Sequence, residues 1–327
     1  MSRTIRDTIL EGKRILEEAC IENAGFDAET MLGFVLGVDR QKLFINSTLA
    51  IDDSQAESFF NMVKRRAGGE PLQYITGEQW FMGRRFLVNP SVLIVRPETE
   101  LLAELAIKYI RQYKKTVADK PVDERDTNKY PGGQIQTKQT LKVLDLCTGS
   151  GALAVTLALE FPDIEVTASD ISEAALAVAG ENAEALGIAG QINFIRSDLF
   201  DDLVYDSSGC PFGESCGING MKDNRFDLIV TNPPYIRTED LAGLQREIRE
   251  HEPLLALDGG ADGLDFYRRI ASEAGTFLKP GGCLMAEIGC DQAKDVSALF
   301  SEAGFAGLQV YQDLAGRDRV IGALNLG

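Results

Sequence analysis

Four consecutive residues, Asn232-Pro233-Pro234-Tyr235, combine groups that could bind a planar amino group. They follow an apolar run at 226–231 that is typical of a buried strand. The asparagine side chain offers a carbonyl acceptor, and the two prolines stiffen the backbone and remove N–H donors beside its carbonyl oxygens. Two acceptors can take both hydrogens of an NH2 group, and the tyrosine ring can stack on its plane. A Pro-Pro turn that closes the strand is the alternative that the tetrapeptide leaves open.

A second set of candidate residues lies at a turn between an expected strand and an expected helix. The turn reads Cys147-Thr148-Gly149-Ser150-Gly151. Glycines at such a turn let a ligand approach the backbone closely, although a tight turn without a ligand explains them equally well. The pattern is neither the three-glycine dinucleotide fingerprint nor a phosphate loop, because no Lys-Ser or Lys-Thr pair follows.

Two acids follow the next two expected strands. Asp170 comes about 20 residues after the glycines, where a carboxylate can accept hydrogen bonds from ribose hydroxyls. Asp198, followed by Leu199, ends the third strand, where an acid can meet the edge of an adenine. Each acid could instead be a helix N-cap, and Asp170 could cap the helix that starts near Ser172. All these candidates, with Asn232, fall at carboxyl ends of predicted parallel strands, where open α/β sheets bind ligands.

The elements that must position these residues alternate between strand and helix after Leu141. We expect strands at 141–146, 164–169, 192–196, 226–231 and 282–288, and helices at 151–160, 172–186, 262–278 and 291–303. This alternation predicts an α/β fold with a mostly parallel sheet and helices on both faces.

The first part of the chain does not alternate between strand and helix. Residues 3–67 have helical spacing, with Asp52 as a plausible N-cap, and predict a small helical domain. Residues 74–94 alternate around two glycines and predict a hairpin connector. Pro97, followed by acids, predicts the first position of a helix that ends near Tyr113.

Composition excludes several classes of protein. The chain has 327 residues, 44% of them hydrophobic, and no apolar run long enough to span a membrane. Six cysteines without C-x-x-C spacing and a single histidine make a zinc site or a disulfide framework unexpected. The N-terminus lacks the apolar segment of a signal peptide, so we expect a cytoplasmic protein. A net charge of -17 disfavours a broad nucleic-acid-binding surface.

Two polar segments, near 114–140 and 204–224, predict insert loops. The first contains Gly132-Gly133-Gln134, and we expect Gln134 to stay unmodified because short tripeptides recur by chance. The second contains Cys210 and Cys216, for which the residues indicate no chemical role.

The motifs together resemble those of class I S-adenosylmethionine-dependent methyltransferases that methylate amino groups: Asp145 to Gly151, Asp170, Asp198 and the Asn-Pro-Pro-Tyr tetrapeptide. Further stretches are similar to the peptide chain release factor N5-glutamine methyltransferase (HemK/PrmC) family: Gly69 to Gly77, Leu93 to Glu100, Glu252 to Leu257 and Asp258 to Gly260. The resemblance covers roughly 1–112, 141–203 and 225–327, and both polar inserts fall outside it.

This resemblance implies a Rossmann-like, mostly parallel seven-stranded sheet and three regions. They are a helical substrate-recognition domain at 1–73, a hairpin connector at 74–94 and a catalytic domain at 95–327. It implies S-adenosyl-L-methionine as cofactor, bound by Cys147 to Gly151, Asp170, Asp198, Leu199 and Asn232. It also implies class I release factors as protein substrates, methylated at the glutamine of a Gly-Gly-Gln loop, with Arg96 and Glu98 near the active site.

Methyl transfer to this amide requires help, because its nitrogen lone pair is delocalised into the carbonyl. Asn232 and the Pro233 carbonyl would accept its two N–H bonds, Pro234 would complete the platform, and Tyr235 would stack on it. Two departures from the family pattern are Val95, where a proline is usual, and Leu199, where some members have tryptophan.

Two other functions remain open. The same tetrapeptide serves enzymes that methylate an exocyclic base nitrogen of DNA or RNA, although the acidity of this chain and its matched N-terminal region argue against them. The other is an adaptor that has the fold without the activity, which the intact motifs disfavour. We expect a monomer that binds neither nucleic acid stably nor a membrane.

Overall fold

The structure, a computed structural model, describes residues 3–118, 140–203, 215–216, 222–223 and 225–327. Most of both polar inserts, including Gln134 and Cys210, lies outside the described residues.

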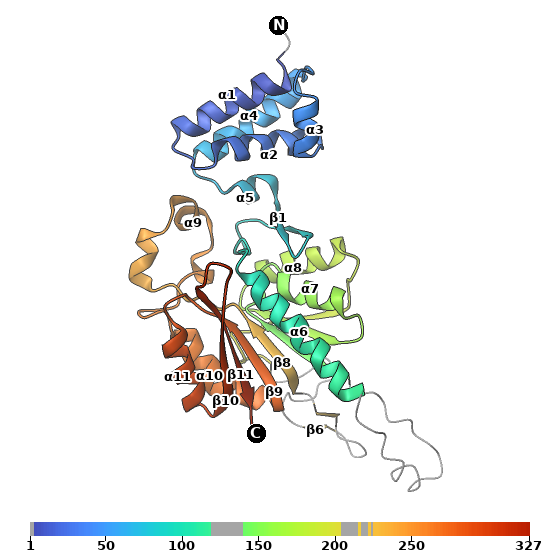
Figure 1. The fold of residues 1–327 in the computed structure, drawn as a ribbon, viewed down its shortest axis with the longest axis vertical. Coiled ribbons are helices and arrows are strands. Elements are labelled where there is room, and N and C mark those ends of the chain that lie inside the picture. The colour runs from blue at the N-terminus through green and yellow to red at the C-terminus, as the bar shows by residue number, and fades with distance from the viewer. Residues whose placement is uncertain (1–2, 119–139, 204–214, 217–221, 224) are drawn as a thin grey trace, which may run out of the picture.

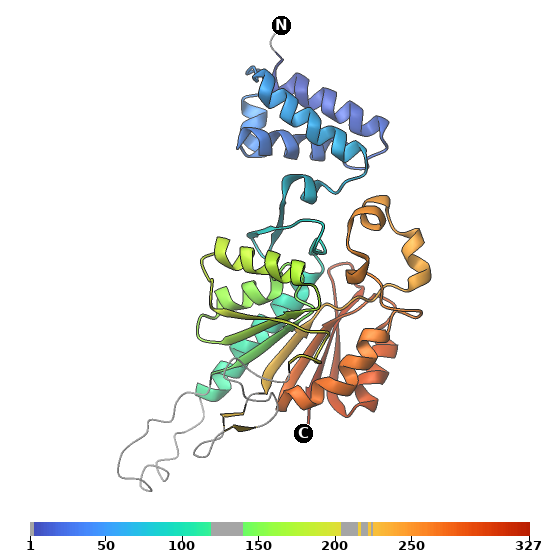
Figure 2. The ribbon, with the colours of Figure 1, turned by 180° about the vertical axis from the view of Figure 1, so that it is seen from behind.

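Five short helices form the first part of the chain: α1 (Ile5–Glu18), α2 (Ala24–Leu36), α3 (Arg40–Ile45), α4 (Asp53–Ala67) and α5 (Leu72–Thr76). Asp52 caps α4 as predicted, and its carboxylate and the Gln55 side chain form a capping box. Apolar side chains from all five helices share one core, which includes Leu16, Met31, Leu32, Leu43, Phe59, Val63, Leu72 and Ile75. This small helical domain stands apart from the sheet in both views (Figures 1 and 2).

A hairpin follows, made of β1 (Glu78–Phe81) and β2 (Arg84–Leu87). Met82 and Gly83 form its turn, and both have positive φ angles. The prediction of a hairpin is confirmed, but its predicted span of 74–94 is too long. The first predicted residues belong to α5. Residues 88–98 continue without strand pairing, and four of them line the cavity described below.

The main sheet has seven strands in the order β10-β11-β9-β8-β3-β4-β5. Their bounds are β3 (Lys142–Leu146), β4 (Glu165–Asp170), β5 (Ile192–Arg196), β8 (Phe226–Thr231), β9 (Leu278–Glu287), β10 (Phe305–Gln312) and β11 (Asp318–Asn325). The pairs from β9 to β5 are parallel, and β11 runs antiparallel to both of its neighbours. The mostly parallel seven-stranded sheet is thus confirmed, although the residue pattern had indicated only five of the strands.

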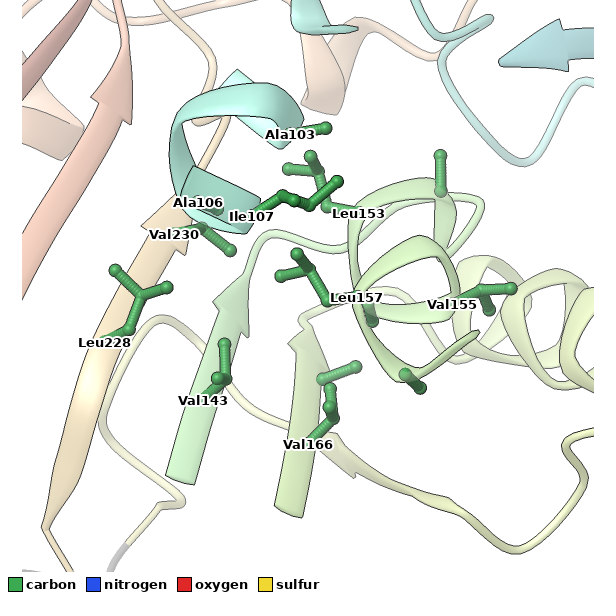
Figure 3. Packing of buried hydrophobic residues seen from close by; sticks show 14 of the residues in the cluster. Ala103, Ala106, Ile107, Val143, Leu153, Val155, Leu157, Val166, Leu228 and Val230 are labelled. Carbon is green, nitrogen blue, oxygen red and sulfur yellow. The ribbon is translucent and has the colours of Figure 1, made fainter. Parts of the chain in front are cut away.

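Helices cover both faces of this sheet: α6 (Thr99–Ala118) and α7 (Ala152–Glu160) on one, and α10 (Asp265–Phe277) and α11 (Ala293–Glu302) on the other. Strand side chains alternate between these layers, so that Val143 joins the α6 and α7 side and Leu144 the other. Figure 3 shows Ala103 and Ala106 of α6 and Leu153 and Leu157 of α7 over β3, β4 and β8. A fifth helix, α8 (Glu173–Ala185), packs against α7, β4 and β5.

Two sequence predictions about α6 are wrong. The helix begins at Thr99 rather than Pro97, because three tight turns precede it: the N–H groups of Thr99, Glu100 and Leu101 donate three residues back. It also continues to Ala118, so the first residues of the predicted insert at 114–140 are helical. In the second insert, the described residues form a two-stranded pair, β6 (Ser215–Cys216) and β7 (Lys222–Asp223).

The chain between β8 and α10 forms η2 (Thr238–Gly243), α9 (Arg246–His251) and η3 (Leu254–Ala256). It lies under the helical domain, where Arg66 Nη1 of α4 reaches Glu247 Oε2 of α9 at 2.5 Å. Across the described ranges, no helix combines the length and apolarity needed to cross a bilayer.

Candidate active site

A cavity of about 300 Å³ lies at the carboxyl ends of β3, β4, β5 and β8. The residues predicted to form the site that line it are Cys147, Thr148, Gly149, Ser150, Asp170, Asp198, Leu199, Asn232 and Pro234. Five other predicted site residues lie around it without lining it: Gly151, Pro233, Tyr235, Arg96 and Glu98. Parallel strands therefore bring together residues that are up to 87 positions apart in the chain, from Cys147 to Pro234.

The glycine turn has two different tasks. Gly149 has a φ of +56°, and the place where a Cβ would stand is open. Its N–H donates to Asp170 Oδ2 at 2.9 Å, which ties the first turn to the second strand. Gly151 has a φ of +79°, and a Cβ there would be only 2.9 Å from the Cβ of Ala179. This second glycine therefore permits the close packing of α7 on α8 rather than contact with a ligand.

Asp170 is held by the backbone on both sides. Its Oδ1 accepts from the Ser172 N–H at 2.9 Å, while Oδ2 accepts from Gly149. The N-cap of α8 is Ser172 itself, whose hydroxyl accepts from the Ala175 N–H, so capping this helix is not the role of Asp170. Burial raises the pKa of Asp170, against the lowering effect of the backbone donors. Each carboxylate oxygen can accept a further hydrogen bond from a ligand hydroxyl.

Asp145 was named within a motif but not as a site residue. It is fully buried in β3, where Oδ2 accepts from the Thr148 hydroxyl at 2.6 Å and from the Ala154 N–H at 3.0 Å. Burial raises the pKa of Asp145 to about 7. The Asp145 side chain thus holds the glycine turn in place. An acid inside an otherwise apolar strand is the sequence feature that indicates this role.

The third strand contributes a charged pair. Asp198 Oδ1 accepts from Arg269 Nη1 at 2.6 Å, and both residues line the cavity. Arg269 comes from α10, 71 residues further along, so the sequence alone did not identify it. Cys147 and Leu199 both have left-handed backbone, with φ angles of 62° and 51°. Such strain in residues other than glycine is frequent at ligand sites.

Asn232 lies with its two side-chain ends in different surroundings. Its Nδ2 donates to the Thr99 hydroxyl at 3.3 Å, and within the described residues its Oδ1 accepts no hydrogen bond. Pro233 is buried behind it. Tyr235 is half-buried, and its hydroxyl lies 3.4 Å from Glu287 Oε1. Burial raises the pKa of Tyr235, so its phenol is neutral at physiological pH.

Arg96 and Glu98 belong to the segment that closes one side of the site. Arg96 Nη2 donates to Glu252 Oε1 at 2.7 Å, and Glu252 Oε2 accepts from the Ile94 N–H at 3.3 Å. Glu252 is 6% exposed and Arg96 is half-buried, and this ion pair joins two walls of the cavity. The charges of both Arg96 and Glu98 act on the pKa of Tyr235, which Arg96 lowers and Glu98 raises.

The remaining walls are mainly apolar and were not predicted. They include Val92, Leu93, Val95, Leu153, Leu255 and Phe266. A cavity of this size, with apolar walls and a few fixed acids, suits a small ligand that carries positive charge and hydroxyl groups. The open place at Gly149 and the free lone pairs of Asp170 fit a nucleoside.

Comparison with known proteins identifies two regions. Residues 7–77 match the family described as the PrmC N-terminal domain, and residues 137–312 match the family described as a methyltransferase domain.

Relatives match almost the whole chain. The release factor glutamine methyltransferase of Geobacter sulfurreducens is 39% identical over 98% of this chain and 96% of its own length. That of Clostridium acetobutylicum is 33% identical over 99% of both chains. A solved structure, the release factor-specific protein-(glutamine-N5) methyltransferase of Alicyclobacillus acidocaldarius, is 28% identical over 74% of this chain and all of its own, with a TM-score of 0.37.

Proposed function

Because this chain belongs to the release factor glutamine methyltransferase family, we propose that it methylates the side-chain amide nitrogen of a glutamine in class I release factors. The glutamine of the Gly-Gly-Gln loop is the expected acceptor. The methyl donor is S-adenosylmethionine. Its sulfonium makes the methyl group electrophilic, and the cavity has the fixed acids and open glycine turn that such a cationic nucleoside requires.

Within this proposal, the residues at the strand ends hold the cofactor. Asp170 accepts the ribose hydroxyls, and Asp198 with Leu199 borders the adenine. The turn from Cys147 to Gly151 contributes backbone and space, with Gly151 acting through the packing of α7. Asp145 acts indirectly, since it holds the Thr148 hydroxyl and the start of α7.

Asn232 and Pro233 hold the acceptor amide. Asn232 Oδ1 and the Pro233 carbonyl accept the two N–H bonds of the substrate, which orients the nitrogen lone pair and stabilises positive charge that develops there. Bound S-adenosylmethionine would supply the methyl group to this lone pair and keep the S–C electron pair on sulfur, and the nitrogen would lose one proton to solvent water. Pro234 lines the cavity beside it, and Tyr235 stacks on the amide plane. Positioning of this kind contributes roughly 7–11 kcal/mol to a barrier.

One observation supports this assignment more than the others. The Asn232 amide is held by its nitrogen, at Thr99, so its carbonyl end is the end left for a ligand at the cavity. An acceptor in that place suits a substrate group that donates hydrogen bonds, such as an NH2 group, and disfavours a carbonyl oxygen, which can only accept them.

The domains have separate tasks in the proposal. Residues 1–73 recognise the release factor, 74–94 connect, and 95–327 perform the transfer, with Arg96 and Glu98 beside the acceptor. We expect a monomer, a reaction in the cytoplasm where release factors act, and no stable binding of nucleic acid. Light scattering during size-exclusion chromatography tests the monomer.

The deciding experiment incubates the enzyme with methyl-labelled cofactor and, separately, a class I release factor, DNA and ribosomal RNA. We expect label only in the release factor, on the glutamine of its Gly-Gly-Gln loop, as located by peptide mass spectrometry. A release factor with that glutamine changed to alanine is the matched control. Label in DNA or RNA, or label in the control, contradicts the proposal.

A further inference from the structure

Behind the Asn-Pro-Pro-Tyr platform lies a carboxyl group that the reaction described above does not use. Glu287 is the last residue of β9 and is 1% exposed. Its main-chain oxygen accepts from the Tyr267 hydroxyl at 2.7 Å, and its Oε1 faces the Tyr235 hydroxyl at 3.4 Å. Its Oε2 is buried and has no hydrogen-bond partner of good geometry among the described residues.

Thr99 connects this carboxyl group to Asn232. It is the first residue of α6 and is 2% exposed. Its Oγ1 accepts from Asn232 Nδ2 at 3.3 Å, and the nearby Thr99 hydroxyl lowers the pKa of the Glu287 carboxyl. A single hydroxyl therefore lies between an amide and an acid.

The number of protons decides how these three groups are arranged. An ionised carboxylate only accepts hydrogen bonds, and a hydroxyl has one proton to donate. If Thr99 donates to ionised Glu287, its oxygen is free to accept from Asn232 Nδ2, and Asn232 Oδ1 then faces away from Thr99. A protonated Glu287 can donate to Thr99 instead. The Thr99 hydroxyl then donates its proton toward Asn232. This favours Asn232 Oδ1, rather than Nδ2, at Thr99.

The second arrangement is inactive in the proposed reaction. It presents the NH2 group of Asn232 to the NH2 group of the substrate, so two donors meet and neither is satisfied. We propose that Glu287 is a positioning residue which, acting through Thr99, presents the carbonyl end of Asn232 to the substrate only while its own carboxyl group is ionised. This inference rests on the proposed function, because it concerns the orientation of the same acceptor.

The surroundings of Glu287 place its ionisation in an accessible range. Burial raises the pKa of Glu287 to about 7, and Glu98, before α6, raises it further. Arg319 of β11 and the hydroxyls of Thr99 and Tyr235 act in the lowering direction. Tyr267 of α10 faces the group as a neutral phenol, since burial raises the pKa of Tyr267 well above its usual value. Turnover is therefore lost as pH falls through this range.

The test compares the pH dependence of kcat in wild type, Glu287→Gln, Thr99→Val and Thr99→Ser. Cofactor and release factor are saturating, between pH 5.5 and 9. For wild type we expect kcat to rise about tenfold for each pH unit on the acid side, as for one titrating group, and then to level off. Glutamine does not titrate there, so Glu287→Gln should lose this acid limb and have a lower plateau.

Thr99→Val removes the connecting hydroxyl, so kcat should fall by ~10-fold or more and become independent of pH over this range. Thr99→Ser restores the hydroxyl and should restore the wild-type profile. Asp145→Asn is the matched control, because burial also raises the pKa of Asp145 to about 7, and this variant should keep the acid limb of kcat at saturating cofactor. Titration calorimetry with S-adenosylmethionine should give wild-type affinity for the Thr99 and Glu287 variants.

An unchanged acid limb in Glu287→Gln, or wild-type turnover in Thr99→Val, overturns the inference. If Glu287→Gln does not fold, the Thr99 pair alone decides between the two results. Infrared difference spectra of the free enzyme provide a readout without turnover: a protonated-carboxyl band at pH 6 that disappears by pH 8 and is weaker in Glu287→Gln, where Asp145 still contributes to it. A band of equal intensity in wild type and Glu287→Gln contradicts the inference. Failure of the proposed function has a different signature, since wild-type enzyme would then transfer no label to release factor at any pH.

Discussion

At the scale of single residues, the site depends on polar side chains that hydrogen bonds to neighbouring groups hold in one orientation. Asn232 is held by its nitrogen, Asp170 has one backbone donor on each oxygen, and Arg96 and Glu252 connect two walls. Each such group is oriented before a ligand arrives. Groups that are positioned in advance need no reorganisation during the reaction, which is how fixed dipoles lower a barrier.

The variant Asn232→Ala should bind S-adenosylmethionine almost normally and turn over ~10²-fold more slowly or worse, because one acceptor for the substrate amide is lost. Calorimetry with the cofactor and single-turnover methylation of release factor measure the two effects separately. If most of the turnover remained, Asn232 would be no more than a turn residue.

The variant Asp170→Ala should weaken cofactor binding by roughly 1–3 kcal/mol, because ribose hydroxyls lose their acceptor. The Gly149 and Ser172 N–H groups lose their acceptor too, so the melting temperature should also fall. Asp170→Asn keeps one acceptor oxygen and should lie between wild type and alanine in both measurements. Equal cofactor affinity in all three proteins would show that the cofactor has been placed wrongly.

At the scale of elements, the helical domain and the cavity wall are joined by charge. Arg66 of α4 pairs with Asp27 Oδ2 at 2.7 Å and with Glu247 Oε2 of α9 at 2.5 Å. α9 belongs to the same segment as Glu252 and Leu255, which form one side of the site. The position of the helical domain is therefore coupled to that wall.

Glu247→Gln should raise KM for intact release factor by about fivefold, equal to a coupling loss of ~1 kcal/mol, and leave cofactor affinity unchanged. Glu250→Gln is the control, since Glu250 pairs only within α9, with Arg246 and Arg249, among the described residues. The two variants remove the same charge from one helix. Equal KM values for the two variants would show that the contact between Arg66 and Glu247 plays no part in substrate recognition.

The sequence predicted those elements whose pattern is local. The strands β3, β4 and β8 are mostly buried and β5 is partly buried; their apolar positions indicated the strands, and their polar ends identified the site. The edge strand β10 and its partner β11 escaped prediction; half of the residues of β10 are exposed, and its pairing with β11 has register shifts. The start of α6 was misplaced because three tight turns, rather than a helical turn, link residues 96–101.

Within the site, the residues that sequence reasoning missed act across long separations. Arg269 meets Asp198 from 71 residues away, and Thr99 meets Asn232 from 133 residues away. Glu287 ends an apolar strand and gave no local signal of its contacts with Tyr235 and Thr99. Such contacts arise from the packing of α6, α10 and the sheet, which no motif of a few residues encodes.

At the scale of the whole molecule, an acidic chain with net charge -17 buries some of its acids at full depth. Asp145 and Glu287 are 0% and 1% exposed, and burial raises the pKa of each to about 7. Surface acids paired with arginine behave in the opposite way, as at Asp262, where Arg268 lowers the carboxyl pKa. The two kinds of carboxyl group act on stability in different pH ranges.

A group whose pKa is raised in the folded protein stabilises it fully below the unfolded pKa, and this contribution is lost as pH rises through the folded value. For Asp145 that range runs from about 4 to about 7. Between pH 5.5 and 8 we expect the free energy of unfolding of the cofactor-free protein to fall by ~2 kcal/mol for Asp145, and by ~2 kcal/mol for Glu287, at 1.36 kcal/mol per pKa unit.

Urea unfolding of the cofactor-free protein at pH 5.5 and 8.0 measures this loss. Asp145→Asn cannot ionise, so it should lose only about half as much stability as wild type over the same interval. Asp262→Asn is the matched control. The lowered pKa of Asp262 means that its contribution is lost only below the unfolded value near 3.8, so this variant should reproduce the wild-type fall in full. A wild-type protein that gained stability between the two pH values would show that buried acids do not govern its pH dependence, and an Asp145→Asn variant with an undiminished loss would exclude Asp145 as a source.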